Sequence, residues 1–211
     1  VSISSDGTIV AIGASENDGN GNNAGHVRVY EYSGNDWVQL GSDIDGEGIN
    51  NASGIVSIIS DGAIVVIVSH IHEDDSEATG HVRVYEYSGG DWIQLGSDID
   101  GEARNDDSGY SVSLDADGDR MAIGAIYNDG NGNSSGHVRV YAYSSGSWTQ
   151  LGSDIYGEAS YDNSGYSVSF NDAGDRVAIG APGNDDESGY SGHVRVYAFS
   201  SVIWTQLGSY I

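Results

Sequence analysis

The sequence contains no cysteine, no lysine and a single proline. Without cysteine the chain can form neither a disulfide nor a thiolate metal site, so its stability must come from a packed core. No stretch approaches the ~20 apolar residues that a membrane-spanning helix needs, and we therefore expect no membrane insertion.

Basic residues are scarce. Thirty-two Asp and Glu stand against seven Arg, which gives a formal net charge of −25. Phosphate backbones and anionic lipid surfaces repel such a chain, which excludes nucleic acid and membrane surfaces as partners. A divalent cation is the natural counter-ion because hard oxygen ligands are abundant, and calcium is the cofactor to consider. The alternative is that the charge only keeps a repetitive β-surface soluble and separate.

One motif, Gly-His-Val-Arg-Val-Tyr, occurs four times, at residues 25–30, 80–85, 136–141 and 192–197. Its histidines are 55, 56 and 56 residues apart, and the four tryptophans of the chain follow the same steps. A period of this length predicts repeated supersecondary units. We interpret the recurring positions as structural: His26, Arg28, Trp37, His81, Arg83, Trp92, His137, Arg139, Trp148, His193, Arg195 and Trp204.

We expect one repeat domain over residues 1–211, with modules at 1–50, 51–107, 108–163 and 164–211. The sequence does not open with a methionine or a signal peptide, and it begins inside the first copy of the repeat. We therefore expect a processed or partial piece of a longer protein.

The third copy is the most complete module. Tyr110–Leu114 alternates and predicts a first strand, and Asp115–Asp119 predicts a hairpin turn. Arg120–Ala125 is apolar and small on both faces, as in a strand buried on both sides. His137–Tyr143 alternates cleanly, and Trp148–Asp154 predicts a fourth strand. Four antiparallel strands at this period predict an all-β fold, namely a β-propeller of four-stranded blades. A β-solenoid is the competing architecture, but its coils are much shorter than this repeat.

These segments resemble the FG-GAP repeat, through Gly109–Leu114, Ala122–Ala125 and Gly136–Tyr141, and through Ala178–Pro182 in the fourth copy. The module is also similar to repeats in large secreted proteins of aquatic microbes. The resemblance implies an extracellular or cell-surface β-propeller like that of integrin α-chains, which is adhesive and often binds calcium. Such propellers usually have seven blades. Four modules therefore leave three possibilities. They form a four-bladed ring, they form part of a ring of seven or eight blades that is completed by further repeats or by a second chain, or they form a filament of repeat units.

Two kinds of loop are candidate calcium sites. The turn of the third copy partly matches integrin-type calcium loops, whereas copies one and two keep only Ser-Asp-Gly. The loop after the second strand has D-x-N-x-N spacing in copies one and three, as in the first half of an EF-hand loop, although the same residues also suit plain turns. The candidate ligands are Asp115, Asp117 and Asp119 in the turn, and Asp18, Asn20, Asn22, Asp129, Asn131 and Asn133 in the loops.

Four further patterns have structural or functional interpretations. The acidic connection at 43–47 recurs at 98–102 and 154–158, and a pair repeated in every blade is a poor match for a catalytic site, which is usually single. Arg two residues after His predicts an ion pair with a carboxylate of the neighbouring blade, such as the Asp of an Asp-Gly turn. His70 and His72 of copy two predict either a zinc or copper site or simple drift. Asn51 and Asn133 begin N-glycosylation sequons.

Two classes of function remain. The first is an extracellular structural or adhesive scaffold that associates with itself or with other extracellular proteins and glycans. The second is a calcium-dependent module that binds carbohydrate or protein through loops at one end of the ring. Aromatic residues outside the repeat pattern are scattered, which favours the first class. We expect no enzymatic activity and no catalytic residues.

Overall fold

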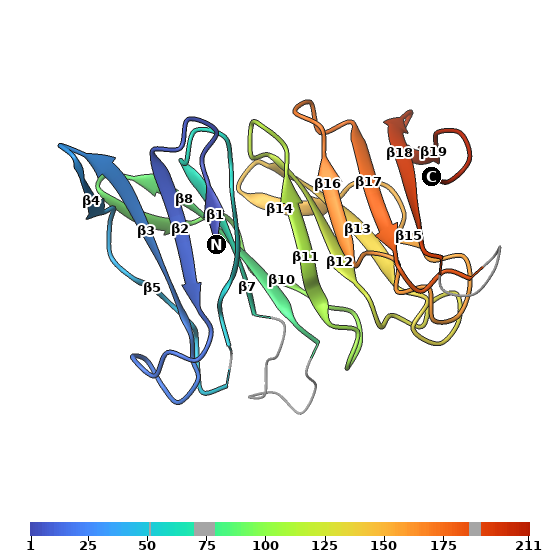
Figure 1. Ribbon diagram of the computed structural model, residues 1–211, viewed down its shortest axis with the longest axis horizontal. Coiled ribbons are helices and arrows are strands. Elements are labelled where there is room, and N and C mark those ends of the chain that lie inside the picture. Colours follow the sequence, from blue (N-terminus) through green and yellow to red (C-terminus); the bar gives the residue numbers. More distant parts are fainter. Residues whose placement is uncertain (51, 70–78, 186–190) are drawn as a thin grey trace. The chain divides into compact units, whose positions relative to one another are not determined.

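The computed structural model describes residues 1–50, 52–69, 79–185 and 191–211. All regular secondary structure in this part of the chain is β-strand. The strands form four antiparallel sheets in sequence order (Figure 1). The predicted all-β fold of four-stranded blades is confirmed, which excludes the β-solenoid. No helix in the described ranges has the length and apolarity to cross a membrane.

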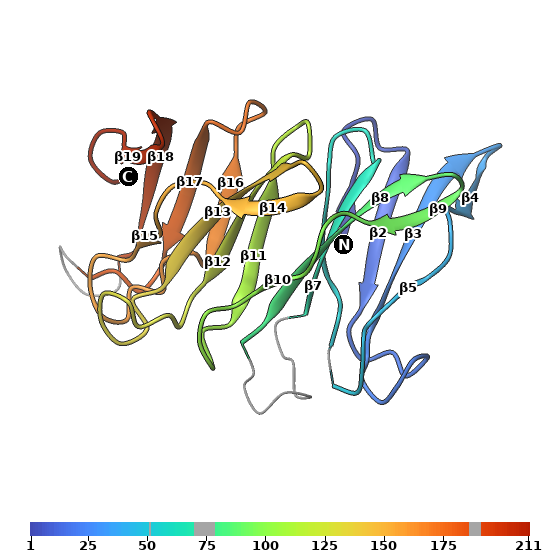
Figure 2. The ribbon, with the colours of Figure 1, turned by 180° about the vertical axis from the view of Figure 1, so that it is seen from behind.

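Each repeat forms one sheet, here called a blade, and the four blades are followed most easily with Figure 2. Blade 1 consists of β1 (Ser2–Ile3), β2 (Ile9–Ala14), β3 (His26–Ser33), β4 (Asp36–Gln39) and β5 (Ile44–Asp45). Blade 2 consists of β6 (Ile55–Ile58), β7 (Ile64–Ser69), β8 (His81–Ser88), β9 (Asp91–Gln94) and β10 (Ile99–Asp100). Blade 3 consists of β11 (Ser108–Leu114), β12 (Arg120–Ala125), β13 (His137–Ser144), β14 (Ser147–Gln150) and β15 (Ile155–Tyr156). Blade 4 consists of β16 (Ser167–Phe170), β17 (Arg176–Ala181), β18 (His193–Ser200) and β19 (Ile203–Gln206).

The fourth strand of the module is shorter than predicted. It was expected over Trp148–Asp154, but β14 ends at Gln150. The chain then breaks away and β15 returns to β13, with Ile155 opposite Val138. The reason is the length of β13. Its C-terminal half, residues 141–144, pairs with β14, and its first two residues, His137 and Val138, pair with β15.

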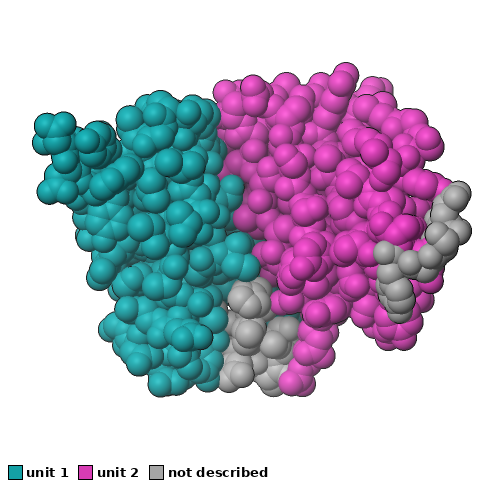
Figure 3. Space-filling model, in the orientation of Figure 1, with its two compact units in different colours: residues 1–100 teal, residues 101–211 magenta. Residues whose placement is uncertain are grey.

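The blades group into two compact units, residues 1–100 and residues 101–211 (Figure 3). In the first unit the core between blades 1 and 2 is built by Ala11, Val27, Val29, Ile44, Ile58, Val65, Ile67 and Tyr85. In the second unit the core between blades 3 and 4 is built by Ala122, Val138, Val140, Ile155, Val177, Ile179 and Tyr197. Burial of these side chains is the main source of stability in each unit.

Each blade contributes alternate residues of the same strands to two different faces. We call the face that packs on the following blade the trailing face, as with Val27 and Val29 in blade 1. We call the face that packs on the preceding blade the leading face, as with Val65 and Ile67 in blade 2. The strands are therefore apolar on both sides, as the sequence predicted for Arg120–Ala125.

The glycine of the Ala-Ile-Gly-Ala strand allows two blades to approach closely. A Cβ atom at Gly124 would collide with the backbone carbonyl of Gly165 in blade 4, and one at Gly13 would collide with that of Gly54 in blade 2. The absence of a side chain at this position is thus a packing requirement of the junction.

Candidate functional site: the junctions between blades

The arginine of each Gly-His-Val-Arg motif lies at a junction. Arg195 on β18 is 3% exposed, and its Nη2 donates to the carbonyl oxygen of Tyr156 at 2.8 Å and to Oγ of Ser164 at 3.2 Å. Its Nη1 lies 3.8 Å from the Glu158 carboxylate. Tyr156 ends β15 of blade 3, and Glu158 and Ser164 lie in the connection between β15 and β16. A buried guanidinium is tolerated because these oxygens replace its water.

The junction between blades 1 and 2 repeats this arrangement. Arg83 is 4% exposed, donates to the carbonyl oxygen of Asp45 at 3.2 Å, and lies 3.7 Å from the Glu47 carboxylate. We expected the carboxylate of an Asp-Gly turn as the partner. It comes instead from the Glu that ends the acidic connection, because that connection runs along the junction as β5, opposite His26 and Val27 of β3.

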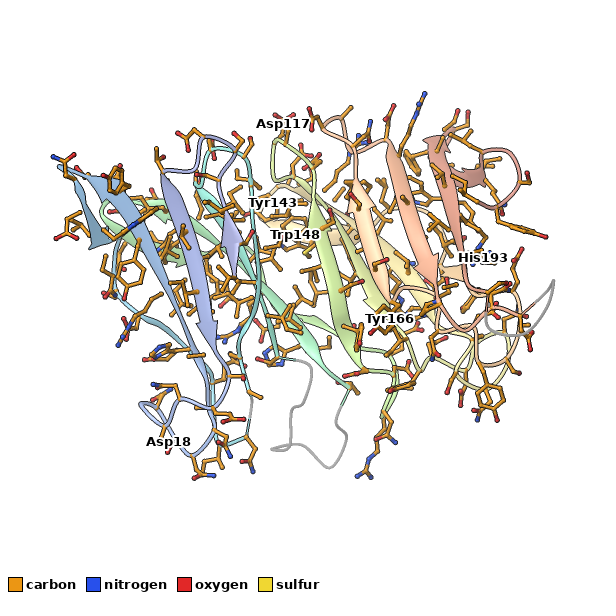
Figure 4. All side chains as sticks on the ribbon, viewed as in Figure 1. Asp18, Asp117, Tyr143, Trp148, Tyr166 and His193 are labelled. Carbon is orange, nitrogen blue, oxygen red and sulfur yellow. The ribbon has the colours of Figure 1, made fainter. Side chains whose placement is uncertain are left out.

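The tryptophan of the motif joins the same blades at the outer strand. Nε1 of Trp92 donates to the carbonyl oxygen of Leu40 in blade 1 at 2.8 Å. Nε1 of Trp204 donates to the carbonyl oxygen of Leu151 in blade 3, also at 2.8 Å. In every blade the Trp ring also lies against an aromatic ring of its own hairpin, as Trp148 does with Tyr143 at 5.2 Å (Figure 4).

Two arginines use the Asp of their own blade. Arg28 binds both carboxylate oxygens of Asp43, with Nη2 at 2.8 Å, and this contact lowers the pKa of Asp43 and raises that of Arg28. Nε of Arg139 lies 3.3 Å from Asp154, and the same guanidinium pairs with Glu102.

Among the described residues, three groups of His and carboxylate side chains have ligand atoms within 4.8 Å of one another. They are His26 with Asp43 and Asp45, His81 with Glu47 and Asp98, and His137 with Glu102 and Asp154. These groups could hold a metal ion, although each contains a carboxylate that an arginine already neutralises. Burial lowers the pKa of His137, against the effect of Asp154. Sequence reasoning missed these groups because their members come from different segments, although all lie at recurring positions.

The Asp side chains of the D-x-N-x-N loops bond within the loop, and the Asn side chains bond to the acidic connection. Oδ1 of Asp18 accepts from the backbone of Asn23 at 2.8 Å, and Asn20 donates to the carbonyl oxygen of Gly46 at 2.8 Å. In copy three Asp129 accepts from Ser134 at 2.8 Å, and Asn131 donates to the carbonyl oxygen of Gly157 at 2.8 Å. The Asn side chains therefore tie the loop to the acidic connection. Asp18 is labelled in Figure 4, and Asn22 and Asn133 are exposed.

The Asp-rich turn joins β11 to β12, with Asp117 exposed at its tip (Figure 4). Asp115 is 5% exposed and accepts from the backbone nitrogen of Arg120 at 3.1 Å. Burial, and then the charge of Asp119, raise the pKa of Asp115. In blade 4 the same position is Asn171, whose Nδ2 donates to Asp175 at 2.8 Å and whose Oδ1 accepts from Arg176.

Some predicted residues lie outside the described residues, namely His70, His72 and the sequon residue Asn51. Another aromatic pair was not singled out from the sequence. The rings of Tyr110 and the exposed Tyr166 lie 4.9 Å apart, and a hydrogen bond between them raises the pKa of Tyr110 to about 12. Tyr166 is labelled in Figure 4. Both belong to the repeated Gly-Tyr-Ser-Val-Ser segment, and for that reason the sequence analysis interpreted them as repeat residues and not as a candidate site.

The fold and its repeated junctions define a protein of the β-propeller class, and solved propeller structures resemble it. A 6-phosphogluconolactonase-like protein from Bacteroides uniformis has a TM-score of 0.66 at 11% identity, over 99% of this chain and 53% of its own. Hydrazine synthase from Kuenenia stuttgartiensis has a TM-score of 0.57 at 12% identity, over 98% and 52%. TolB from Acinetobacter baumannii has a TM-score of 0.53 at 18% identity, over 99% and 42%. The chain thus spans about half the length of these proteins, and the likeness is one of fold.

Residues 98–141 match the family model of the FG-GAP repeat. The chain therefore contains an FG-GAP repeat, which begins at the end of the second module and runs through β13 of the third as far as Tyr141. No curated protein matches the sequence significantly.

Proposed function

We propose that this chain is a structural or adhesive β-propeller scaffold of an extracellular or cell-surface assembly. The observation that carries the proposal is the use of the recurring polar residues. The Arg and Trp side chains of blades 2 and 4 bind the backbone and carboxylates of the preceding blade. Side chains engaged in this way hold blades together, whereas catalysis needs a unique constellation of residues.

The FG-GAP match and the net charge of −25 support an extracellular location. Proteinase K treatment of intact source cells tests it, with an antibody against this chain. We expect the signal to disappear while a cytosolic marker is protected. Protection of the chain until the cells are lysed would overturn the location.

A purely structural scaffold needs no dedicated sugar site, and a glycan array probed with the labelled chain distinguishes it from the carbohydrate-binding alternative. We expect no glycan to bind above background. Specific hits would instead favour the carbohydrate-binding alternative, for which the exposed Tyr166 beside Tyr110 is the aromatic platform to mutate first.

Calcium binding is a second candidate, favoured by the turn at Asp115. Its carboxylate is buried beside the charge of Asp119, and a cation would relieve that repulsion. Isothermal titration with CaCl2 should give heat that the variant Asp119→Asn loses, with MgCl2 as the control titrant. Wild-type protein without heat or thermal stabilisation in calcium would refute this site.

A further inference from the structure

A buried histidine faces two carboxylates within the second unit. The side chain of His137 on β13 is 4% exposed, and its Nδ1 makes no hydrogen bond, since the facing Oδ2 of Asp154 is 3.9 Å away. Glu102 completes the group, because ligand atoms of the three side chains lie within 4.8 Å of one another. All three belong to residues 101–211, so their arrangement is set within one compact unit. A buried imidazole nitrogen without a partner calls for an explanation, and an unoccupied ligand position is one.

The separation of these atoms suits a cation between them. Nitrogen and oxygen ligands lie about 2.0–2.2 Å from zinc, so two of them at a tetrahedral centre are about 3.3 Å apart. The Glu102 side chain is 44% exposed, so it can turn toward the centre and leaves the centre accessible to water. One imidazole, two carboxylates and a water make up a donor set of the kind found in open zinc sites, which have three protein ligands.

Arg139 neutralises only part of the negative charge in this group. Its guanidinium pairs with Oε1 of Glu102, and its Nε lies 3.3 Å from Oδ1 of Asp154. Two carboxylates thus share one guanidinium, and the second oxygen of each is outside these contacts. The group at His26 differs, because Nε and Nη2 of Arg28 donate to both oxygens of Asp43. The group at His137 therefore keeps both charge and ligand oxygens for a cation.

Neighbouring side chains hold the ligands in position. The hydroxyl of Tyr156 donates to Oδ2 of Asp154 at 3.0 Å, and Nε2 of Gln150 donates to Oδ1 at 2.5 Å. Partners that orient a ligand in this way strengthen metal binding. Burial lowers the pKa of His137, against the effect of Asp154, so the imidazole is in the neutral form that binds metal ions.

We propose that His137, Glu102 and Asp154 bind a zinc ion, with water as the fourth ligand. The ion would join three segments of the second unit, namely the connection between β10 and β11, strand β13 and the connection between β14 and β15. Its role would be structural, since it fastens the acidic connection to blade 3. The site is separate from the calcium candidate at Asp115, which offers oxygen ligands alone, and it does not depend on the location of the chain.

Isothermal titration of ZnCl2 into metal-free protein tests the site. Wild-type protein should gain Tm in zinc, and its stoichiometry should fall by one ion in His137→Gln and in Glu102→Gln. His193→Gln is the matched control and should bind as wild type does. His193 has the same motif position and a side chain that is 2% exposed, but Tyr210 stands where blade 3 has its aspartate. Tyr156→Phe should keep the stoichiometry and weaken the binding of this ion about tenfold.

Wild-type protein that gives neither heat nor a higher Tm in millimolar ZnCl2 would overturn the proposal. Unchanged stoichiometry in folded His137→Gln or Glu102→Gln would do the same, and an equal loss in His193→Gln would place the ion elsewhere. Equally tight binding of CaCl2, lost in the same variants, would show a site selective for oxygen and refute the assignment of zinc. Circular dichroism in EDTA checks folding, and the exposed Glu102 decides the case if His137→Gln does not fold.

Discussion

The indole nitrogen of Trp204 donates a hydrogen bond to the main-chain carbonyl oxygen of Leu151, 2.8 Å away and one blade earlier. The two residues are 53 positions apart, close to one period of the repeat. The motif tryptophan therefore contacts the preceding blade as well as its own hairpin, and its removal should destabilise the packing of both blades.

Trp204→Phe keeps most of the ring and removes this donor. We expect it to lower the free energy of unfolding by about 1 kcal/mol, because the Leu151 carbonyl loses its partner. Trp37→Phe is the control, since Trp37 is 45% exposed. Urea unfolding monitored by circular dichroism measures both. Equal losses in the two variants would mean that ring packing, and not the hydrogen bond, is what matters.

Gly124→Ala should destabilise the second unit. The added methyl collides with the backbone of Gly165, which cannot move aside as a side chain can, and overpacking of this kind costs about 1–3 kcal/mol. Gly180→Ala, at the same motif position in blade 4, meets only the side chain of Ser167 and should change the Tm little. Differential scanning calorimetry distinguishes them, and a Gly180 variant as damaged as the Gly124 variant would contradict the close approach of backbones.

Arg195→Ala should lower stability by about 3 kcal/mol, because it leaves the polar groups of the preceding connection without their buried donor. Arg28→Ala is the matched comparison, since Arg28 contacts Asp43 of its own blade with a half-exposed side chain and should matter little. Thermal unfolding of the two variants at the same pH and salt tests the difference. The opposite order would show that the junction arginines are dispensable.

Asp115→Asn should stabilise the protein at neutral pH. It gives blade 3 the residue that blade 4 has at Asn171, whose amide donates to Asp175 where Asp115 faces the charge of Asp119. The raised pKa of Asp115 means that wild-type stability falls as the pH rises through the unfolded and then the folded pKa of this group. The advantage of the variant should therefore shrink below about pH 4, where the carboxyl is protonated in both states. Tm values from pH 3 to pH 7 measure this, and an advantage independent of pH would refute the electrostatic explanation.

Much of the fold follows from repetition and alternation in the sequence. The His137–Tyr143 alternation predicted β13, and the apolar Arg120–Ala125 segment predicted β12 with its exact bounds. The predicted fourth strand extended beyond its observed end. The sequence pattern alone does not show that the first residues of β13, His137 and Val138, pair with a separate strand, β15. The proposed calcium residues Asp18 and Asn20 fit a ligand spacing, yet the same side chains make hydrogen bonds within the fold.

The sequence by itself determined the period, the strand order and the two-sided apolar strands, because these depend on local alternation and turn chemistry. Only the tertiary structure decided which carboxylate meets each arginine, since Glu158 and Arg195 are brought together by the course of the connection and not by any spacing. It also decided that Arg28 binds both oxygens of Asp43, whereas one oxygen of Asp154 faces His137. Identical residues in a repeat acquire different roles only when the residues around them differ.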